Sequence, residues 1–199
     1  MRVASIDIGT NSVLLLVAER DGAGTLAAVL ERARVTRLGA GVDRTRQLAP
    51  EAVERTLACL GDYAADLRRL GVTRLDVVGT SAMRDASAGE LFVARAAELL
   101  GVAPRVVSGD EEARLTFEGA LVGLDLAGAL SVFDVGGGST EIMWLEVTGA
   151  GRPPRLIDQT SLRHGVVSLA EQFGGDLIES EAYASMVETV AAAVSDSPR

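Results

Sequence analysis

Lysine is absent from this chain of 199 residues, and all 19 of its basic residues are arginine. P-loop nucleotide-binding proteins need a lysine beside the phosphates, and Schiff-base enzymes need a lysine amine, so both classes are excluded. The formal net charge of −9 also argues against a nucleic-acid partner, because proteins that bind nucleic acid present a basic face.

Cysteine and histidine each occur once. Cys59 has no partner for an internal disulfide, and its place beside the apolar stripe of a predicted helix is typical of a small buried residue. A Ser-His-Asp triad would have to use His164, but no G-x-S-x-G motif accompanies it. We therefore expect neither a structural zinc site nor serine-hydrolase chemistry.

Long apolar runs are also missing. The longest one, Val13 to Ala18, has six residues, far short of the roughly 20 that cross a bilayer. Asp7 interrupts the first apolar stretch and no cleavage-type region follows, so no secretory signal is predicted. The hydrophobic fraction of 48% is enough for a core in one large or two small domains. We expect a cytoplasmic protein without a membrane partner.

The first part of the chain predicts three strands followed by alternating helices and strands. A turn over 9–12 separates strands at 3–8 and 13–19, and a third strand is predicted over 26–35. Pro50 begins a helix whose apolar residues have helical spacing, and Gly71 ends it. The remaining predicted elements are a strand over 75–78, a helix ending at Leu100, a short strand over 105–107 and a helix from Ser108 to Val122.

The pattern restarts near residue 130. A strand over 131–135, a glycine turn and a return strand over 140–147 repeat the opening of the chain with an offset of 127 residues. A strand over 155–161 and helices over 166–173 and 181–194 are predicted to follow.

This repetition predicts two like domains, residues 1–125 and 126–199. Only the 72 residues from 128 to 199 remain for the second copy. The second domain is therefore expected to be abbreviated, or the chain to be a piece of a longer protein. Phe133 and Trp144, in the strands of the second copy, are expected in its core.

Each glycine turn joins two strands and follows an aspartate. Consecutive N–H groups in such a turn form an anion site, and glycine lets the backbone approach a phosphate closely. Asp7 and Asp134 are then oxygen ligands of the kind that Mg²⁺ prefers. Either turn alone is typical of an ordinary hairpin, but two turns at matching positions favour a pair of phosphate-binding loops.

Three acidic residues, Asp110, Glu111 and Glu112, open the helix that follows Ser108. A capping box and the helix dipole account for Asp110 and Glu111. Glu112 lies beyond what capping needs, and it is a candidate general base for activating water. Arg84 is either a phosphate ligand or a surface arginine.

Four segments together resemble the exopolyphosphatase / guanosine pentaphosphate phosphohydrolase family of the acetate kinase–sugar kinase–Hsp70–actin superfamily. The last two in chain order are highly specific, whereas the first fits many members of the superfamily. The segments are Ile6-Asp7-Ile8-Gly9-Thr10-Asn11-Ser12, Gly79-Thr80-Ser81-Ala82-Met83-Arg84, Ser108-Gly109-Asp110-Glu111-Glu112-Ala113-Arg114-Leu115 and Asp134-Val135-Gly136-Gly137-Gly138-Ser139-Thr140-Glu141.

The resemblance implies an α/β fold in which two ribonuclease-H-like (actin-like ATPase) domains flank a cleft, with the second domain incomplete. It also implies removal of terminal phosphates with Mg²⁺, or with Mn²⁺ in its place. Glu112 would be the base that activates water, Asp134 and Glu141 would position metal or water, and Asp7 would help to hold the metal. The phosphate-binding residues would be Gly9, Thr10, Asn11, Ser12, Arg84, Gly136, Gly137, Gly138, Ser139 and Thr140.

Several functions remain open at this stage. Hydrolysis of inorganic polyphosphate from its end is the first expectation, and hydrolysis of guanosine pentaphosphate is the second. A kinase of the superfamily would need an adenosine pocket late in the second domain, which is not found in this sequence. A non-catalytic phosphate- or nucleotide-binding fragment is a further alternative. Unpaired edges of an unfinished sheet favour association, so a homodimer is expected.

Overall fold

The structure is a computed structural model that describes residues 1–22, 24–87, 89–148, 154–175 and 177–196. By its internal contacts the chain divides into two compact units, Met1–Val107 and Ser108–Arg199. Each unit has its own sheet and its own apolar core.

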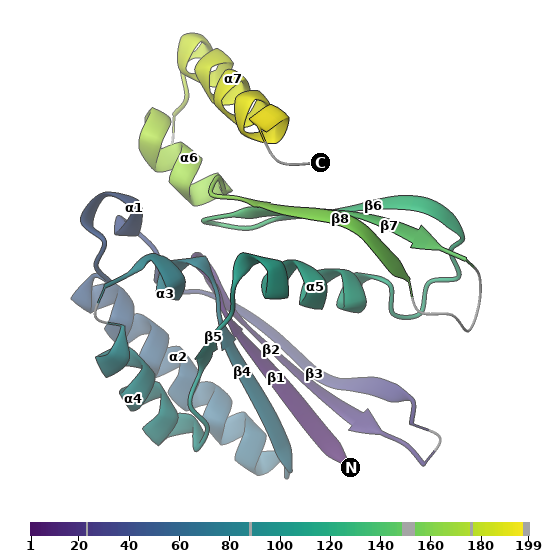
Figure 1. The fold of residues 1–199 in the computed structure, drawn as a ribbon. Coiled ribbons are helices and arrows are strands. Elements are labelled where there is room, and N and C mark those ends of the chain that lie inside the picture. Colours follow the sequence, from purple (N-terminus) through teal and green to yellow (C-terminus); the bar gives the residue numbers. More distant parts are fainter. Residues whose placement is uncertain (23, 88, 149–153, 176, 197–199) are drawn as a thin grey trace. The chain divides into compact units, whose positions relative to one another are not determined.

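The first unit contains a mixed five-stranded sheet in the order β3-β2-β1-β4-β5 (Figure 1). The first three strands form two antiparallel hairpins, and β4 and β5 run parallel to β1. The strands are β1 (Arg2–Ile8), β2 (Ser12–Arg20), β3 (Leu26–Val35), β4 (Arg74–Gly79) and β5 (Arg105–Val106), and the helices are α1 (Val42–Thr45), α2 (Pro50–Arg69), α3 (Ser81–Asp85) and α4 (Glu90–Leu100).

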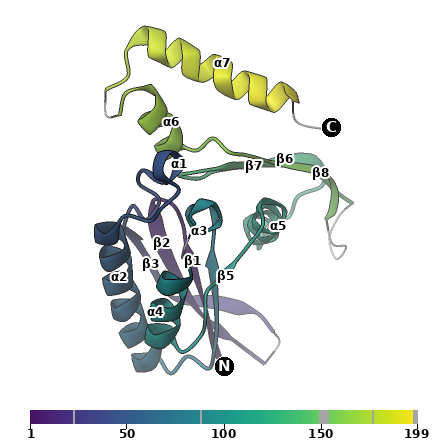
Figure 2. The ribbon, with the colours of Figure 1, turned by 60° about the vertical axis from the view of Figure 1, so that its left-hand side comes forward.

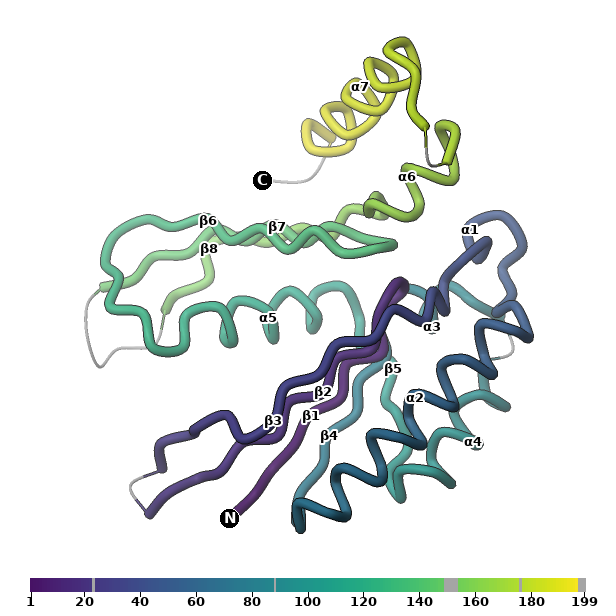
Figure 3. Tube along the Cα trace, turned by 180° about the vertical axis from the view of Figure 1, so that it is seen from behind, coloured from purple at the N-terminus to yellow at the C-terminus, as the bar shows by residue number. Residues whose placement is uncertain are grey.

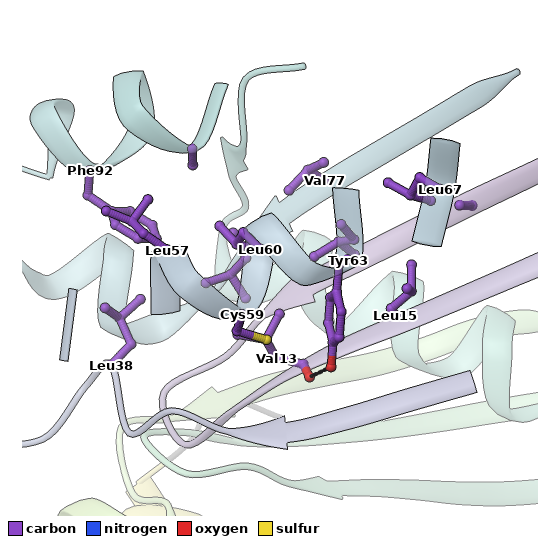
Figure 4. Packing of buried hydrophobic residues seen from close by; sticks show 14 of the residues in the cluster. Val13, Leu15, Leu38, Leu57, Cys59, Leu60, Tyr63, Leu67, Val77 and Phe92 are labelled. Atoms are coloured by element: carbon purple, nitrogen blue, oxygen red, sulfur yellow. Dashed lines mark hydrogen bonds between the residues drawn. The ribbon is translucent and has the colours of Figure 1, made fainter. Parts of the chain in front are cut away.

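Helices α2 and α4 lie side by side on one face of this sheet (Figure 2). Side chains alternate along a strand, so Ile6 and Ile8 face the helices while Asp7 between them faces the opposite side. The two isoleucines are completely buried, and Leu60 and Tyr63 of α2 belong to the same cluster (Figure 4). This packing gives the first unit a core that is independent of the second unit.

The second unit is built on an antiparallel sheet in the order β6-β7-β8. Its elements are α5 (Gly109–Ala120), β6 (Gly128–Val135), β7 (Thr140–Val147), β8 (Arg155–Leu162), α6 (Val166–Phe173) and α7 (Ser180–Asp196). Helix α5 lies along the sheet (Figure 3), where Ala113 and Phe117 cluster with Met143 and Leu145. Because α5 buries its apolar residues on this sheet, the units divide after Val107, whereas the sequence predicted a boundary after residue 125.

The internal duplication extends over more of the chain than the two turns. With the same offset of 127 residues, β1, β2 and β3 correspond to β6, β7 and β8, and α1 and α2 correspond to α6 and α7. The structure confirms the predicted α/β class, and the described strands follow one another along the chain as the sequence predicted.

Two features of the fold differ from the prediction. Helices α1 and α3 were not predicted, because each has only about one turn and such a short segment carries no apolar periodicity. Phe133 was expected in the core but is 63% exposed. Its strand turns Leu130 and Val132 toward the cluster beneath α5, so the alternate residues face away. No helix in the described ranges has the length and apolarity to cross a membrane.

Tyr63 and Cys59 lie deep in the first core. The Tyr63 hydroxyl donates a hydrogen bond to the Val13 carbonyl at 3.2 Å (Figure 4). Burial raises the pKa of Tyr63 from 10.0 to about 12, and it also raises the pKa of the Cys59 thiol. Cys59 is fully buried, which confirms the prediction that it is a packing residue.

We predict that Tyr63 keeps its proton until about pH 12 in the folded protein. The pKa of Tyr63 is raised above the unfolded value of 10.0, so the folded state binds this proton more tightly than the unfolded state. The contribution of Tyr63 to the free energy of unfolding is therefore fully present below pH 10.0 and is lost as the pH rises toward about 12. Ultraviolet difference titration of tyrosinate can test this against Tyr63→Phe, which retains only the exposed Tyr183. Titration of both tyrosines together in the folded protein would contradict the prediction.

Candidate functional site

The two glycine turns are closed by the same hydrogen bond. In the first unit the Gly9 N–H donates to the Ser12 carbonyl at 3.0 Å, and in the second unit the Gly136 N–H donates to the Ser139 carbonyl at 2.9 Å. A Cβ at either glycine would lie 3.0 or 3.1 Å from that carbonyl oxygen. Both turns therefore favour glycine at their first position, and the sequence similarity of the turns reflects one backbone geometry.

The carbonyl groups of the first turn are bound by the segment that follows β3. The N–H groups of Thr36 and Arg37 both donate to the Asn11 carbonyl, at 3.0 and 2.8 Å, and the Gly39 N–H donates to the Thr10 carbonyl at 2.9 Å. Gly39 packs so closely that a Cβ there would overlap the Thr10 methyl group. Hydrogen bonds to its carbonyl groups thus hold the first turn in place.

The second turn is held in the same manner by the start of α6. The Val166 N–H donates to the Gly136 carbonyl at 3.0 Å, and the Val167 N–H donates to the Gly137 carbonyl at 2.8 Å. A Cβ at Gly165 would lie 2.6 Å from the Gly138 nitrogen and even closer to the backbone of Gly137. Thr140 adds a hydrogen bond from its hydroxyl to the His164 carbonyl at 2.6 Å.

The N–H groups of both turns contrast with their carbonyl groups. Among the described residues, none accepts a hydrogen bond from the N–H of Thr10, Asn11, Gly137 or Gly138. A backbone whose carbonyls are bound by the protein and whose successive N–H groups are left for other partners is suited to binding an anion. Each turn therefore has the backbone arrangement of a phosphate-binding loop.

Arg84 lies in the same unit as the first turn. Its helix α3 is joined to that turn by a hydrogen bond between the Ser81 and Thr10 hydroxyls at 2.6 Å. Nη1 of Arg84 donates to the Val107 carbonyl at 2.8 Å, so the guanidinium is anchored at the end of β5. A guanidinium has five N–H donors in a planar arrangement, and this geometry suits it to phosphate oxygens. The structure thus brings Arg84 and the first turn together.

Asp134, Glu141 and Ser161 form a row across the second sheet. Asp134 pairs with Glu141 on the neighbouring strand, and Glu141 pairs with Ser161 on the next. The Ser161 hydroxyl donates to Oε1 of Glu141 at 2.7 Å, and Glu141 is only 1% exposed. A buried carboxylate needs such hydrogen bonds to compensate for the loss of water, so Ser161 holds Glu141 in one orientation.

Helix α5 lies over this row and carries Glu112. At its start, a Cβ at Gly109 would lie 2.7 Å from the Ser161 hydroxyl. Further along, the Thr116 hydroxyl donates to Oδ2 of Asp134 at 2.9 Å. Glu112 lies between these two contacts and shares a helix face with Thr116, four residues later. Glu112 and the two carboxylates of the row therefore lie on the same side of the second unit.

Ser108 caps α5 as the sequence predicted. Its hydroxyl accepts a hydrogen bond from the Glu111 N–H at 3.2 Å. Three acidic residues in the first turn of α5 also stabilise the helix, because their charge interacts favourably with the positive end of the helix dipole. Glu112 therefore sits on a helix whose start is fixed both by this cap and by the contact with β8.

The carboxylates of the row are candidate metal ligands. In the described part of the chain, no three histidine, cysteine, aspartate or glutamate side chains gather closely enough to hold a metal by themselves. Mg²⁺ often binds one or two carboxylates together with substrate phosphates and water. Asp134 and Glu141 are adjacent carboxylates at the ends of the second turn, and they fit a site of that kind.

Asp7 belongs to the first unit, and it faces away from α2. It lines a hollow of about 570 Å³ on that side of the sheet, together with Leu14, Leu16 and Arg32. Of the predicted site residues, the first turn, Asp7 and Arg84 thus lie in the first unit. The second turn, Glu112, Asp134 and Glu141 lie in the second.

Sequence reasoning missed three residues that organise the second group: Thr116, Ser161 and Gly165. Ser161 and Gly165 reach their partners only through the folding of β8 and α6 onto the turn, so no local pattern marks them. Thr116 was more accessible to prediction, because it follows the candidate base Glu112 by four residues on a predicted helix.

Known proteins are similar to this chain over most of its length. A protein-family profile described as the Ppx/GppA phosphatase family matches residues 16–199. A curated relative, exopolyphosphatase 2 of Mycobacterium tuberculosis, is 46% identical over an alignment of 151 residues, and the match covers 71% of this chain and 47% of that protein. The chain spans about half the length of the curated relatives it matches.

Solved structures agree with this result. The crystal structure of an exopolyphosphatase-like protein has a TM-score of 0.89 and 33% identity, and the match covers 98% of this chain and 60% of that one. A member of the Ppx/GppA family from Aquifex aeolicus has a TM-score of 0.74 and 33% identity, and the match covers 96% of this chain and 61% of that one.

We predict that Gly165→Ala destabilises the second unit by about 1–3 kcal/mol, because the new methyl group would meet backbone atoms that cannot move aside cheaply. Chemical denaturation measures the effect. Gly119→Ala is the matched control: no atom lies within 4 Å of a Cβ at this position in α5, so it should be neutral or stabilising. Equal stability of the two variants would contradict the prediction.

Proposed function

The chain belongs to the Ppx/GppA phosphatase family, and from this premise we propose that it is an exopolyphosphatase that hydrolyses the terminal phosphate of inorganic polyphosphate. The observation that carries the proposal is the pair of turns whose carbonyls are bound by the protein, while the N–H groups of Thr10, Asn11, Gly137 and Gly138 have no acceptor among the described residues. Each turn provides N–H donors for a phosphate group, and Glu112 in the second unit supplies a carboxylate for the attacking water.

In the proposed reaction, water attacks the terminal phosphorus in line with the bridging oxygen that leaves. Glu112 accepts the proton of the water, the new P–O bond forms, and the phosphoanhydride bond breaks. The products are orthophosphate and a polyphosphate one unit shorter. Backbone N–H groups of the turns and the Arg84 guanidinium stabilise the negative charge of the phosphoryl oxygens, which is the main contribution that a protein makes to phosphoryl transfer.

Mg²⁺ is the proposed cofactor, with Mn²⁺ as the alternative. Asp134 and Glu141 would hold it in the second unit, and Asp7 is the candidate ligand from the first. When bound, the metal would neutralise charge on the phosphate oxygens. Two hydroxyl side chains orient the carboxylates of the second unit, because Thr116 donates a hydrogen bond to Asp134 and Ser161 donates one to Glu141.

Guanosine pentaphosphate is the alternative substrate, because the same attack by water on a terminal phosphoryl group would convert it to the tetraphosphate. The name of the relative from M. tuberculosis favours polyphosphate. A cytoplasmic homodimer is the proposed form of the protein. A non-catalytic phosphate-binding role is the outcome expected if the folded protein binds polyphosphate but releases no phosphate.

We predict that Glu112→Gln lowers phosphate release from polyphosphate by a factor on the order of 10² or more, because the amide cannot accept the proton of the attacking water. Release with Mg²⁺ present is measured in parallel for polyphosphate and guanosine pentaphosphate, and the ratio of rates identifies the substrate. Glu118→Gln removes the same charge from an exposed ion pair on α5, and it should leave turnover unchanged. Normal turnover in Glu112→Gln would exclude Glu112 as the base.

Ser161→Ala tests the carboxylate row. Removing the hydroxyl leaves Glu141 without the hydrogen bond at 2.7 Å, and loss of such a supporting contact typically costs about 10- to 100-fold in activity or metal affinity. We expect turnover to fall and the metal concentration for half-maximal rate to rise. Ser131→Ala, at an exposed position of β6, is the control. If both variants behave alike, Ser161 does not position Glu141.

A further inference from the structure

Two arginines adopt a backbone conformation that arginine rarely occupies. Arg37 has a φ of 51° and Arg46 a φ of 56°, and every other described residue with positive φ is a glycine. Glycine adopts this conformation at no steric cost, whereas a side chain with a Cβ is strained in it. Arg46 takes this conformation at the end of helix α1, where its N–H donates to the Val42 carbonyl. Arg37 takes it in a loop, and residues held in such conformations cluster at binding sites.

Both arginines lie in the loop over residues 36–46, next to the first turn. The Arg37 N–H donates to the Asn11 carbonyl at 2.8 Å, so this residue is directly attached to the turn. The Arg46 carbonyl accepts hydrogen bonds from the Ser87 N–H and hydroxyl, at 2.8 and 2.7 Å. The loop is therefore fixed at one end on the turn and at the other on the residues just after α3, the helix of Arg84.

The loop over residues 36–46 carries a net positive charge of +2, because Asp43 is its one acidic residue against three arginines. On the preceding strand, Arg32 forms an ion pair with Asp66, and Arg34 forms one with Asp62. Arg37, Arg44 and Arg46 are exposed, and their side chains have no hydrogen bond or ion pair within the described part of the chain. Six described arginines share this property, and half of them lie in this loop: Arg20, Arg37, Arg44, Arg46, Arg68 and Arg74.

We propose that Arg37, Arg44 and Arg46 bind phosphate groups of the substrate beyond the terminal one, so that the loop over residues 36–46 extends the phosphate site of the first turn. This inference rests on the proposed function. A chain with a net charge of −9 must attract a polyanion through local positive charge, and three exposed guanidinium groups beside the turn supply it. Guanidinium groups also bind phosphate oxygens in pairs, which a backbone N–H does not.

The experiment measures equilibrium binding of polyphosphate to the protein, with Glu112→Gln as the background so that the ligand is not consumed. Arg37→Gly and Arg46→Gly should each weaken binding about 3- to 10-fold, and the dependence of affinity on salt should become less steep by about one released ion per arginine. The melting temperature should stay equal or rise, because glycine relieves the backbone strain. Arg37→Lys should keep the salt dependence but only part of the affinity, because lysine retains the charge and not the paired donors.

Two further variants keep the test decisive. Arg44→Gln changes a residue inside the short helix α1, where the backbone is unstrained, so it should weaken binding without affecting folding. Arg68→Gln removes an equally exposed arginine in the last turn of α2, and it should leave the affinity unchanged.

The outcomes separate this inference from the function on which it rests. If the background protein binds polyphosphate and the three loop variants bind it equally well, the loop arginines do not contact substrate, and only this inference fails. The same conclusion follows if Arg37→Gly and Arg46→Gly lower the melting temperature without changing affinity. If the background protein binds no polyphosphate at all, the inference and the proposed substrate fail together.

Discussion

The constraint on which the site depends is the binding of the turn carbonyls by the protein itself. In each unit a segment that follows the third strand returns to the glycine turn and donates N–H groups to it: residues 36–39 in the first, and the start of α6 in the second. A backbone carbonyl left beside a phosphate would repel it. Because these carbonyls are already bound, the turn presents mainly N–H groups, and the proposed phosphate site has donors that do not depend on a lysine.

The second unit holds two neighbouring acidic side chains, Asp134 and Glu141, on adjacent strands. Buried carboxylates are costly unless their oxygens accept hydrogen bonds, and here each acidic side chain of the row has a hydroxyl partner. Thr116 donates a hydrogen bond to Asp134, and Ser161 donates one to Glu141. The contact of Gly109 with Ser161 and the bond of Thr116 to Asp134 both set the position of α5 on the sheet. The helix that carries Glu112 is thus aligned by the same residues that orient the carboxylates.

The duplicated halves have diverged in how they use equivalent positions. Asp7 and Asp134 occupy matching places, but within its unit Asp134 is bound by Thr116 of α5, whereas Asp7 lines a hollow together with leucines, Glu31 and Arg32. The segment that supports the turn has diverged as well. In the first unit it is a loop over residues 36–39 with Arg37 in the left-handed conformation, and in the second it is the start of helix α6 at Val166. The two turns share their geometry, while the residues around them differ.

The sequence by itself determined the hairpins, the two turns, the cap of α5 and the limits of β7 and α6, because glycine, alternation and capping act over a few residues. It also pointed to Glu112 as the acid that capping does not require. Only the tertiary structure decided that α5 belongs to the second unit, that Phe133 is exposed, and that Ser161 and Gly165 organise the site. Those outcomes depend on which surfaces meet after strands and helices have formed, and contacts between residues far apart in sequence leave no periodic trace along the chain.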